Sequence, residues 1–444
     1  MKGESERVLI VGLGESGRAA ARFFLARGAS VAATDRRTPE ELGDAAAEMK
    51  KIGVELHLGS HPPALFEQQD LIVPSPGVPW NLPELERARS AGVRTAGEVE
   101  IAASELKGFS IGVTGTNGKT TVTSLIAHIL ETAGRPVRAI GNIGTPLLAA
   151  VEGSRDEDCN VIELSSFQLE AMNRFRCAVA VVLNVTPDHL DRHGDLARYA
   201  EVKARILDPQ TSDDAAVLNA DDEICKSLSS RAKGRVVWFS RRSRLARGAW
   251  VENGSIFLDG KKIAPSELPI RGSHNLENAL AAVAAASLAG VDAETVVRGL
   301  ATFRAVEHRL EHVRTLDGVD YYNDSKATNV DAALKAAESF SGGLWIILGG
   351  RDKGGDFAPL ARLLGTRAKG ALLIGEAAEK IRVAIAPTTP CVLCGDLENA
   401  VAAAHEKASA GDTVLLAPAC ASFDQFHNYA DRGSAFKRLT EELN

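Results

Sequence analysis

Short apolar runs alternate with helix-like segments near the start of the chain. The apolar run 8–11 is followed by Gly12-x-Gly14-x-x-Gly17, a helix-like segment at 18–27, a second apolar run and Asp35. An apolar run, a glycine-rich turn and a helix are the parts of a strand–turn–helix–strand unit. We therefore expect a small α/β domain over residues 1–106.

The same alternation continues through the rest of the chain. It predicts a mostly parallel sheet with helices on both faces in residues 107–307, an alanine-rich helix at 278–288, and a third α/β unit in residues 308–444. The apolar runs that we expect to be strands are 161–163, 179–184 and 216–219 in the central region and 344–348, 371–374 and 413–417 in the last. The sequence thus predicts an α/β protein of three domains.

Composition narrows the class of partner. The chain has 444 residues, of which 45% are hydrophobic and 25% charged, as in ordinary globular proteins. A net charge of −7 argues against binding to nucleic acid or to an anionic membrane, since either would favour a basic surface. No apolar stretch approaches the roughly 18 residues of a membrane span. We therefore expect a cytoplasmic protein that binds small molecules and inserts into no membrane.

The cysteines indicate no disulfide framework and no metal site. Six of them are scattered along the chain, a usage that fits reduced thiols better than a disulfide framework. The one close pair, Cys391-Val-Leu-Cys394, lies in a strand-like run without a second pair or nearby histidines. We interpret this pair as structural in preference to a metal or redox site.

The most informative run is Gly112-Val-Thr-Gly-Thr-Asn-Gly-Lys-Thr-Thr121, which lies between an apolar run and a helix-compatible segment. Glycines let backbone N–H groups face phosphate oxygens, Lys119 supplies a positive charge for the outer phosphates, and the Thr120 hydroxyl suits Mg²⁺. This pattern predicts an ATP-binding phosphate loop. Val113 stands where the strict motif has glycine, and the alternative is a Gly/Thr-rich turn that merely joins a strand to a helix.

The glycine pattern at 12–17 is less specific. Its turn allows a diphosphate to approach a helix N-terminus, and Asp35 at the end of the next strand can accept a hydrogen bond from a ribose or a base. It is compatible with NAD, with another diphosphate such as a UDP-sugar, or with a simple turn.

Three further residues lie near the phosphate loop in the predicted sheet. Glu163 ends a strand, so its carboxylate should project from the same sheet edge as the loop, where with Thr120 and the nucleotide phosphates it would complete a Mg²⁺ site. The alternative is a solvated acid at a strand end. His189 follows the next strand and has a functional or a structural role with equal weight. Lys203 lies on a helix-like segment, and spacing alone gives it no role.

The last domain has three polar loops after strands. They are Asn323-Asp-Ser-Lys-Ala-Thr-Asn329, the glycine-rich run 349–355 with Lys353, and the run 417–426 with Ser422. Together they predict a substrate-binding face, although the first is also compatible with a solvated loop that caps a helix.

These motifs resemble those of the Mur ligases over essentially the whole chain. The resemblance rests on the runs 115–121, 163–170, Asn184-Val-x-x-Asp-His189, Gly272-Ser-His-Asn275-x-x-Asn278 and 323–329. The 323–329 run and Ala-Cys-Ala-Ser-Phe-Asp-Gln-Phe426 are similar to the branch that adds D-glutamate to UDP-N-acetylmuramoyl-L-alanine. The resemblance implies a Rossmann-like N-terminal domain, a central phosphate-loop ATPase-type domain with a parallel sheet, and a C-terminal Rossmann-like α/β domain.

The resemblance also implies a reaction. ATP would phosphorylate the substrate carboxylate to an acyl phosphate, which the amine of D-glutamate attacks through a tetrahedral intermediate to give an amide, ADP and phosphate. The product is a peptidoglycan precursor. Two Mg²⁺ ions, a carbamylated lysine, closure of the domains and a monomeric state are further implications of the resemblance.

By similarity, each site receives a set of residues. Lys119, His189 and Lys203 would be catalytic, and the second Mg²⁺ would be held by His189 and carbamylated Lys203, the first by Thr120 and Glu163. The ATP-binding residues would be Gly115, Thr116, Asn117, Gly118, Lys119, Thr120, Thr121, Asn275, Arg309 and Asp324. The UDP-substrate would contact Ser16, Asp35, Arg36, Arg37, Gly77, Asn142 and Ser165, and D-glutamate would contact Thr328, Lys353, Ser422 and Phe423.

Two residues fit the pattern of the Mur ligases less well. Tyr429 stands where the family often has phenylalanine. Glu15 would repel a diphosphate, so we expect Glu15 to be a loop position only.

Three rival functions remain. A folylpolyglutamate synthase typically has Gly-Lys-Gly-Ser in its loop and lacks a domain like residues 1–105. An NAD-dependent dehydrogenase leaves the ATP loop unexplained. The third rival is an ATP-gated binding protein without ligase activity.

Overall fold

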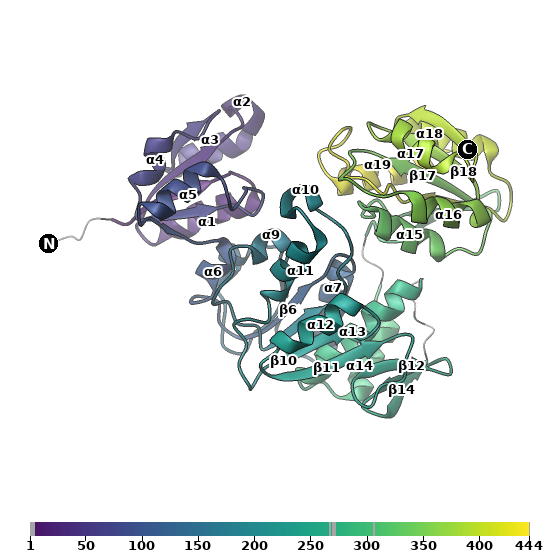
Figure 1. Cartoon of the computed structure of the whole chain (residues 1–444), viewed down its shortest axis with the longest axis horizontal. Coiled ribbons are helices and arrows are strands. Elements are labelled where there is room, and N and C mark those ends of the chain that lie inside the picture. Colours follow the sequence, from purple (N-terminus) through teal and green to yellow (C-terminus); the bar gives the residue numbers. More distant parts are fainter. Residues whose placement is uncertain (1–4, 266–267, 269–271, 305–306, 444) are drawn as a thin grey trace.

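The computed structural model describes residues 5–265, 268, 272–304 and 307–443, which form three α/β domains (Figure 1). The N-terminal domain lies above one end of the central domain, and the C-terminal domain lies above the other (Figure 1). The three sheets fall within residues 1–106, 107–307 and 308–444. The predicted three-domain α/β class is therefore confirmed, while the domain limits stay predictions.

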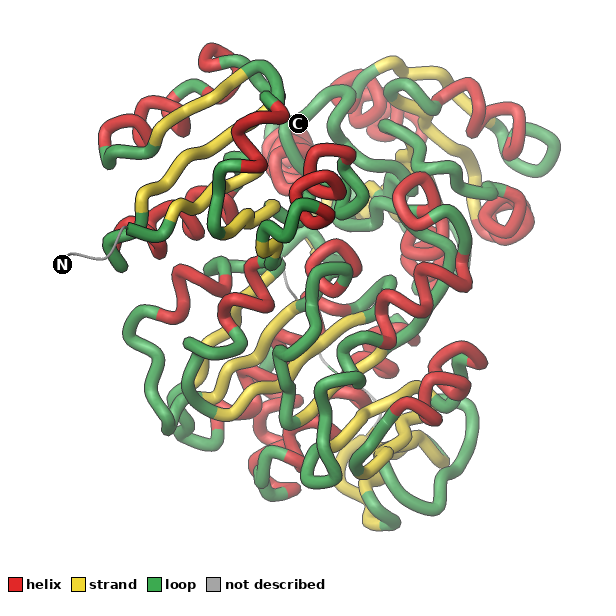
Figure 2. Tube along the Cα trace, turned by 60° about the vertical axis from the view of Figure 1, so that its left-hand side comes forward, coloured by secondary structure: helices red, strands yellow, loops and turns green. Residues whose placement is uncertain are grey.

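The N-terminal domain has a five-stranded parallel sheet in the order β3-β2-β1-β4-β5. Its helices cover the two faces of the sheet (Figure 2). The elements are β1 (Arg7–Val11), α1 (Glu15–Ala26), β2 (Ser30–Asp35), α2 (Pro39–Leu42), α3 (Asp44–Lys51), β3 (Glu55–Leu58), α4 (Pro63–Glu67), β4 (Leu71–Pro74), α5 (Pro83–Ser90), β5 (Arg94–Thr95) and α6 (Glu98–Ala102).

Helix α1 begins at Glu15, earlier than the predicted position 18, and Gly17 lies inside its first turn. A Cβ atom on residue 17 would lie 1.9 Å from the carbonyl oxygen of Gly12. Glycine at this position is therefore required for the close packing of α1 on the turn after β1.

The central domain has a nine-stranded sheet in the order β14-β13-β12-β11-β10-β9-β6-β8-β7, parallel from β7 to β12. The strands are β6 (Phe109–Thr114), β7 (Val137–Gly141), β8 (Cys159–Glu163), β9 (Val179–Val182), β10 (Ala215–Asn219), β11 (Arg235–Ser240), β12 (Ala249–Glu252), β13 (Ser255–Leu258) and β14 (Lys261–Pro265). The helices are α7 (Lys119–Thr132), α8 (Leu147–Val151), α9 (Ser166–Leu169), α10 (Leu190–His193), α11 (Leu196–Ala204), α12 (Glu223–Leu228), the 3-10 turn η1 (Ser229–Arg231), α13 (Ser273–Leu288) and α14 (Ala293–Thr302).

The mostly parallel central sheet is as predicted, although β7, β11 and β12 were not among the predicted strands. The last two strands, β13 and β14, pair antiparallel at one end of the sheet and were not predicted. The alanine-rich helix α13 packs with α7 in one buried apolar cluster, in which alanines allow a close approach to the sheet. This packing fixes α7, and with it the phosphate loop at its N-terminus, against β6.

The C-terminal domain has a six-stranded sheet in the order β15-β16-β20-β17-β18-β19, in which only the β15–β16 pair is antiparallel. Its strands are β15 (Glu311–Leu316), β16 (Val319–Asn323), β17 (Leu344–Gly349), β18 (Ala368–Ile374), β19 (Cys391–Gly395) and β20 (Thr413–Leu416). Its helices are α15 (Val330–Glu338), α16 (Ala358–Arg367), α17 (Ala378–Ile385), α18 (Leu397–Lys407) and α19 (Tyr429–Glu441).

The two outer domains are attached to the central domain in different ways. One apolar cluster runs from Phe24 in α1 through Ala102 in α6 and Leu147 in α8 to Leu164 beside the central sheet. The buried residues of the two apolar clusters in the C-terminal domain all lie at or beyond Leu310. The N-terminal domain therefore shares a core with the central domain, whereas the C-terminal domain has its own core and can move more easily.

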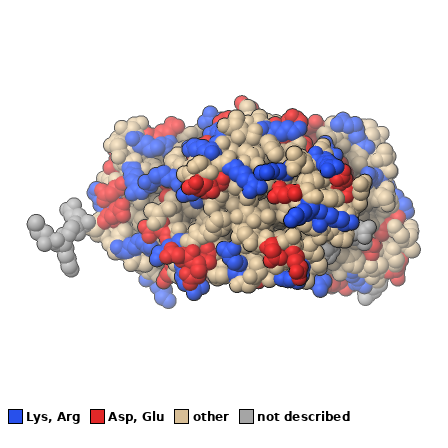
Figure 3. Space-filling view, turned by 90° about the horizontal axis from the view of Figure 1, so that it is seen from below, with Lys and Arg blue, Asp and Glu red and all other residues tan. Residues whose placement is uncertain are grey.

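The surface carries both signs of charge. Basic and acidic side chains are interspersed over the face shown in Figure 3. None of the helices in the described residues is long and apolar enough to cross a lipid bilayer. The six cysteines are free thiols, and burial raises the pKa of Cys391 and of Cys394.

Candidate active site

The phosphate loop connects β6 to α7 at the carboxyl edge of the central sheet. Its backbone is held by the segment after β9, because the Thr116 N–H donates to the Asn184 carbonyl and the Asn117 N–H to the Asn184 side chain, both at 2.9 Å. Gly118 has a φ of 90° and precedes α7 as its N-cap. These bonds fix a loop whose remaining N–H groups and helix N-terminus suit an anionic phosphate.

Two lysines converge on the same carbonyl oxygen of this loop. Lys119 Nζ donates to Gly115 O at 2.9 Å and to Thr116 O at 2.7 Å, and Lys203 Nζ donates to Gly115 O at 2.8 Å. Burial lowers the pKa of Lys119 to about 8, although Glu163 opposes this change. Lys119 thus lies against the backbone of the predicted phosphate loop, and its contact with phosphate stays a prediction.

Lys203 is the more unusual of the two lysines. It comes from the last turn of α11, is only 1% exposed, and has its Nζ 4.5 Å from the centre of the Tyr199 ring. Burial, reinforced by the nearby Lys119, lowers the pKa of Lys203 well below its ordinary value. Burial therefore favours the neutral form of the amine, which is the form that reacts with CO₂.

The predicted Mg²⁺ pair is brought together. Thr120 Oγ1 donates to Glu163 Oε2 at 2.7 Å, and Asn142 Nδ2 donates to Glu163 Oε1 at 2.7 Å. Strands β6 and β8 are neighbours in which Val113 is paired with Glu163, so the strand-end acid faces the loop. A hydroxyl and a carboxylate are hard oxygen ligands, and this donor set fits Mg²⁺.

His189 lies after β9 at the same sheet edge, with a φ of 54° in the left-handed region. Its ring lies edge-on to Phe167, with the ring centroids 4.8 Å apart, and its Nε2 is 3.7 Å from Asp188 Oδ2. Burial lowers the pKa of His189 to about 4, although Asp188 opposes the shift. A neutral imidazole at this position has a lone pair available for a metal ion.

A narrow crevice lies between the central and C-terminal domains, on the side of the loop where several predicted ATP-binding residues gather. It encloses about 30 Å³, room for water but not for an adenine ring. Its lining includes the predicted residues Asn117, Gly118, Thr121, Arg309 and Asp324, together with Asn184, His274, Glu277, Asn278, Ala332 and Lys335. A nucleotide would therefore require these two domains to move apart.

Asn275 and Asp324 are two of the residues predicted to contact ATP. Asn275 is buried and does not line the crevice, but its Oδ1 accepts from Nδ2 of Asn278, which does, at 3.1 Å. Burial raises the pKa of Asp324 to about 6, although Arg309 opposes the shift. Asn278 had been part of the sequence motif without an assigned contact, and the structure places it on the crevice wall.

A larger cavity of about 520 Å³ lies at the carboxyl edge of the N-terminal sheet. Six of the seven residues predicted to contact the UDP-substrate line it, namely Ser16, Asp35, Arg36, Arg37, Gly77 and Asn142. The seventh, Ser165, is not part of the lining and instead caps α9 through a bond from the Gln168 N–H. Glu15, expected only as a loop position, is also on the cavity wall.

Another cavity, of about 470 Å³, lies between the 186–190 segment and the C-terminal domain. Thr328 and Lys353 line it, whereas Ser422 and Phe423 do not. Ser422 is buried and Phe423 is 63% exposed. The structure thus brings together two of the four residues predicted for D-glutamate and leaves the other two outside this cavity.

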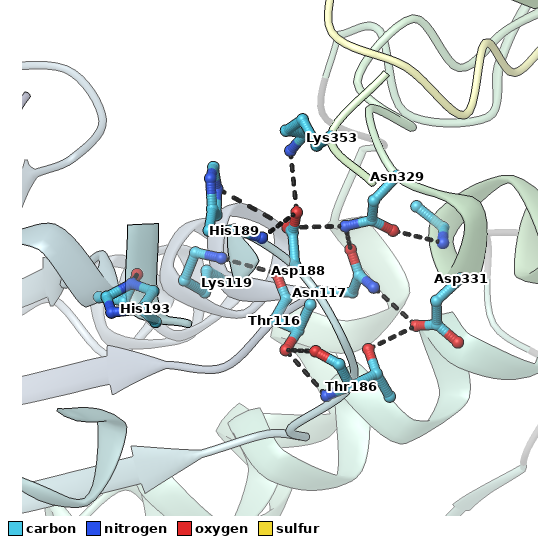
Figure 4. Close-up of polar contacts among 12 residues, drawn as sticks. Thr116, Asn117, Lys119, Thr186, Asp188, His189, His193, Asn329, Asp331 and Lys353 are labelled. Carbon is cyan, nitrogen blue, oxygen red and sulfur yellow. Dashed lines mark hydrogen bonds and ion pairs between the residues drawn. The ribbon is translucent and has the colours of Figure 1, made fainter. Parts of the chain in front are cut away.

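Polar contacts across this cavity join the two domains (Figure 4). Lys353 Nζ donates to Asp188 Oδ1 at 2.9 Å, and Asn329 Nδ2 donates to Asp188 Oδ2 at 3.0 Å. Asn117 Nδ2 in the phosphate loop donates to Asp331 Oδ2 at 2.7 Å. Sequence reasoning missed Asp188 and Asp331, although the position of Asp188 directly before His189 was a usable signal.

Comparison with known proteins gives a consistent result. Three family models match the chain: Mur ligase MurD-like, N-terminal domain, at residues 6–97; Mur ligase middle domain at 113–286; and Mur ligase, glutamate ligase domain, at 308–420. The UDP-N-acetylmuramoylalanine–D-glutamate ligase of Solibacter usitatus is 52% identical over 444 residues, covering 100% of this chain and 99% of the relative.

A second relative and a solved structure agree. The ligase of the same name from Acidobacterium capsulatum is 50% identical and covers 99% of this chain and 97% of its own length. A pseudomurein peptide ligase type C from Methanothermus fervidus is 21% identical, has a TM-score of 0.64, and covers 99% of this chain and 100% of its own. At that identity the solved structure is evidence for the fold alone.

Proposed function

Because this chain belongs to the Mur ligase family, we propose that it joins D-glutamate to UDP-N-acetylmuramoyl-L-alanine, with conversion of ATP to ADP and phosphate. The reaction would supply a peptidoglycan precursor. The observation that carries this proposal is the position of Asn142, which lines the 520 Å³ cavity and also donates to Glu163 beside the phosphate loop. A substrate carboxylate that extends from this cavity would therefore arrive next to the γ-phosphate of ATP.

The chemistry requires activation of a carboxylate, whose direct leaving group would be oxide. Transfer of the γ-phosphoryl group forms a bond from the carboxylate oxygen to phosphorus and breaks the bond to ADP. The amine nitrogen of D-glutamate then attacks the acyl carbon, and phosphate leaves from the tetrahedral intermediate. Lys119 would move from Gly115 O and Thr116 O to the transferring phosphoryl oxygens and stabilise their negative charge.

The chain offers ligands for two Mg²⁺ ions. Thr120 and Glu163 would hold one, and His189 with carbamylated Lys203 would hold the other. When bound, the ions neutralise negative charge on the phosphoryl groups. The burial of Lys203 and its lowered pKa support the carbamate, because CO₂ addition to nitrogen gives an anionic oxygen ligand in place of a cation that would repel the metal.

D-Glutamate would enter the 470 Å³ cavity and bind Thr328 and Lys353 there. Ser422 and the Phe423 backbone would contact it only after a movement of the C-terminal domain. The crevice that holds the predicted ATP-binding residues is too narrow for a nucleotide, and the C-terminal domain has its own apolar core. Both observations support a domain that moves during the reaction. Closure over the reactants would then exclude water from the acyl phosphate.

The proposed substrates indicate where in the cell the protein acts. ATP and a nucleotide-linked precursor are cytoplasmic compounds, so the enzyme would act in the cytoplasm, and we propose that it acts as a monomer. Sedimentation velocity at micromolar concentration tests the monomeric state, and a dimer would contradict it.

The direct test is ATP-dependent phosphate release with UDP-N-acetylmuramoyl-L-alanine and one of four acceptors. We expect release with D-glutamate and none with L-glutamate, L-alanine or meso-diaminopimelate. Release with another acceptor would reassign the amino acid site. Absence of phosphate release with all four acceptors would favour an ATP-gated binding protein or a ligase of folate-type substrates.

A further inference from the structure

One arginine of the central domain bonds the wall of the UDP cavity, which is the 520 Å³ cavity at the N-terminal sheet. Arg192 lies in α10, and it donates from Nη2 to the Val78 carbonyl at 2.9 Å and from Nη1 to the Gly77 carbonyl at 3.4 Å. Gly77 and Val78 both line the cavity. Within the described residues, no other side chain of the central domain hydrogen-bonds the loop 75–80.

This loop has few backbone bonds of its own. It reads Ser75-Pro-Gly-Val-Pro79, and its two prolines have no N–H to donate. The Ser75 N–H donates to the Val11 carbonyl at 2.8 Å, and the Val78 N–H donates to the Ser75 carbonyl at 2.9 Å. In the part of the chain that the structure describes, the carbonyls of Gly77 and Val78 accept no backbone hydrogen bond. Their donors come from the guanidinium of Arg192.

Arg192 is itself anchored in the central domain by Glu170. Its Nε donates to both carboxylate oxygens of Glu170 at 3.2 Å, and its Nη2 donates to Oε2 at 2.5 Å. The two side chains are only 13% and 14% exposed, so water competes little for these bonds. The Glu170 N–H donates to the Ser166 carbonyl of α9 at 3.0 Å. This pairing fixes the direction in which the guanidinium points.

The same arginine is one helical turn from His189. The Arg192 N–H donates to the His189 carbonyl at 3.0 Å. The Phe167 ring contacts both side chains, since its centroid lies 4.8 Å from Cζ of Arg192 and 4.8 Å from the centroid of the His189 ring. Arg192 therefore connects the wall of the UDP cavity to a residue at the proposed phosphoryl-transfer site.

We propose that Arg192 is a positioning residue that fixes the wall of the UDP cavity relative to His189. This inference rests on the proposed function, in which the substrate extends from the UDP cavity to the phosphate loop. The two ends of such a substrate are held by different domains, so the distance between the two sites must match its length. Misplacement of a reacting group by about 1 Å lowers a rate about 100-fold.

Arg192→Gln tests the proposal by separating binding at each site from turnover, which needs both sites. The calorimetric Kd for UDP and for ADP should each stay within about twofold of the wild-type value, because each ligand lies on one side of the link. At saturating substrates, kcat for phosphate release should fall at least about tenfold. An unchanged kcat would overturn the proposal. A loss of UDP or ADP affinity as large as the fall in kcat would also overturn it, by assigning the effect to one site.

Arg89→Gln is the matched control. Arg89 Nη2 donates to the Trp80 carbonyl at 2.8 Å, and its guanidinium lies 4.9 Å from the centre of the Trp80 ring. Arg89 thus holds the same loop from within the N-terminal domain, and its loss should leave kcat close to the wild-type value. An equal fall in kcat for Arg89→Gln and Arg192→Gln would overturn the proposal, because order within the loop would then explain both.

Two more variants separate the link from charge and from folding. Arg192→Lys keeps the charge but cannot reproduce the planar fork, so its kcat should lie between those of Arg192→Gln and the wild type. Full recovery would show that charge alone suffices and would overturn the proposal. If Arg192→Gln does not fold, Glu170→Gln weakens the anchor and keeps the bonds to the loop. Its kcat should fall about threefold at unchanged UDP affinity, and an unchanged kcat would overturn the proposal.

The wild-type assay distinguishes a failure here from a failure of the proposed function. Wild-type turnover with UDP-N-acetylmuramoyl-L-alanine and D-glutamate, together with an unchanged kcat in Arg192→Gln, would reject only the role of Arg192. Absence of turnover in the wild type would reject the proposed function and this role with it.

Discussion

The ammonium nitrogen of Lys353 lies 2.9 Å from Oδ1 of Asp188, so the lysine expected to bind D-glutamate is paired with a carboxylate of the protein. Both side chains are mostly buried, with exposed fractions of 19% and 8%. Although burial disfavours its ionised form, Lys353 and His189 lower the pKa of Asp188. If Lys353 binds D-glutamate as we propose, Asp188 occupies the position that a carboxylate of this substrate would take.

Removing this competing charge should strengthen binding of D-glutamate. In Asp188→Asn the amide oxygen can still accept from Asn329, but the ion pair with Lys353 is lost. We expect the KM for D-glutamate to fall about threefold to tenfold, since an ion pair of this kind contributes roughly 1 kcal/mol. Steady-state kinetics at saturating ATP measure the change.

Asp331→Asn is the matched control for this prediction. Asp331 also joins the two domains, through Asn117, but does not contact Lys353 within the described residues. Its KM for D-glutamate should stay close to the wild-type value. An increase in KM for Asp188→Asn would show that Asp188 helps to bind D-glutamate.

Lys119→Ala should abolish phosphate release and leave UDP binding intact. The lysine lies on the phosphate loop and does not line the UDP cavity. Loss of a charge that stabilises the transferring phosphoryl group typically lowers kcat by about 10²–10³. Phosphate release and calorimetric binding of UDP check the two halves of the prediction, with the exposed Lys262→Ala as a control. Normal turnover would exclude Lys119 from the reaction.

The hydroxyl of Thr120 should be needed for the response to Mg²⁺. Thr120→Val keeps the shape of the side chain and removes the group that donates to Glu163, whereas Thr120→Ser keeps the hydroxyl. We expect Thr120→Val to lower phosphate release about 100-fold and to shift the Mg²⁺ requirement upward, with Thr120→Ser within a few-fold of wild type. Equal Mg²⁺ titrations for the two variants would contradict this role.

A small carboxylic acid should partly rescue Lys203→Ala. The substitution removes the buried amine that we expect to be carbamylated, and formate or acetate would supply an oxygen ligand in the space left. Activity should be negligible without the acid and rise with its concentration, while Lys203→Arg should show no rescue. A fully active Lys203→Ala variant would rule out a metal-binding carbamate. In the wild type, ¹³C NMR with labelled bicarbonate should detect the carbamate directly.

His274 should make the protein less stable in acid. Burial, with a contribution from Arg309, lowers the pKa of His274 to about 3 from an ordinary 6.5. The unfolded chain therefore binds a proton as the pH falls below 6.5, whereas the folded chain does so only near pH 3, and stability is lost across this window. The loss should amount to about 3 kcal/mol at pH 4.

Calorimetric unfolding of His274→Gln at pH 7 and pH 4 measures this contribution. The variant should lose less stability than the wild type between the two pH values. His427→Gln, at an exposed histidine, is the control and should behave as the wild type. An unchanged acid sensitivity in His274→Gln would assign the loss to other groups.

Features that depend on local spacing could be predicted from the sequence. The phosphate loop is a continuous run between a strand and a helix, so Lys119 and Thr120 follow from the order of residues alone. Glu163 also follows, because the carboxyl ends of neighbouring parallel strands meet at one edge, and β6 pairs with β8 as such strands do. The same rule placed Asp35 and Gly77 at one cavity of the N-terminal domain.

Features that depend on contacts between distant segments required the tertiary structure. The lowered pKa of Lys203 results from packing of α11 under the phosphate loop, where desolvation disfavours the charged form of the amine. Asp331 meets Asn117 across 214 positions of sequence, and no periodicity links them. The sequence by itself therefore determined the elements and the chemistry of single loops, whereas the pKa shifts and the domain contacts were decided by the neighbours that folding brings together.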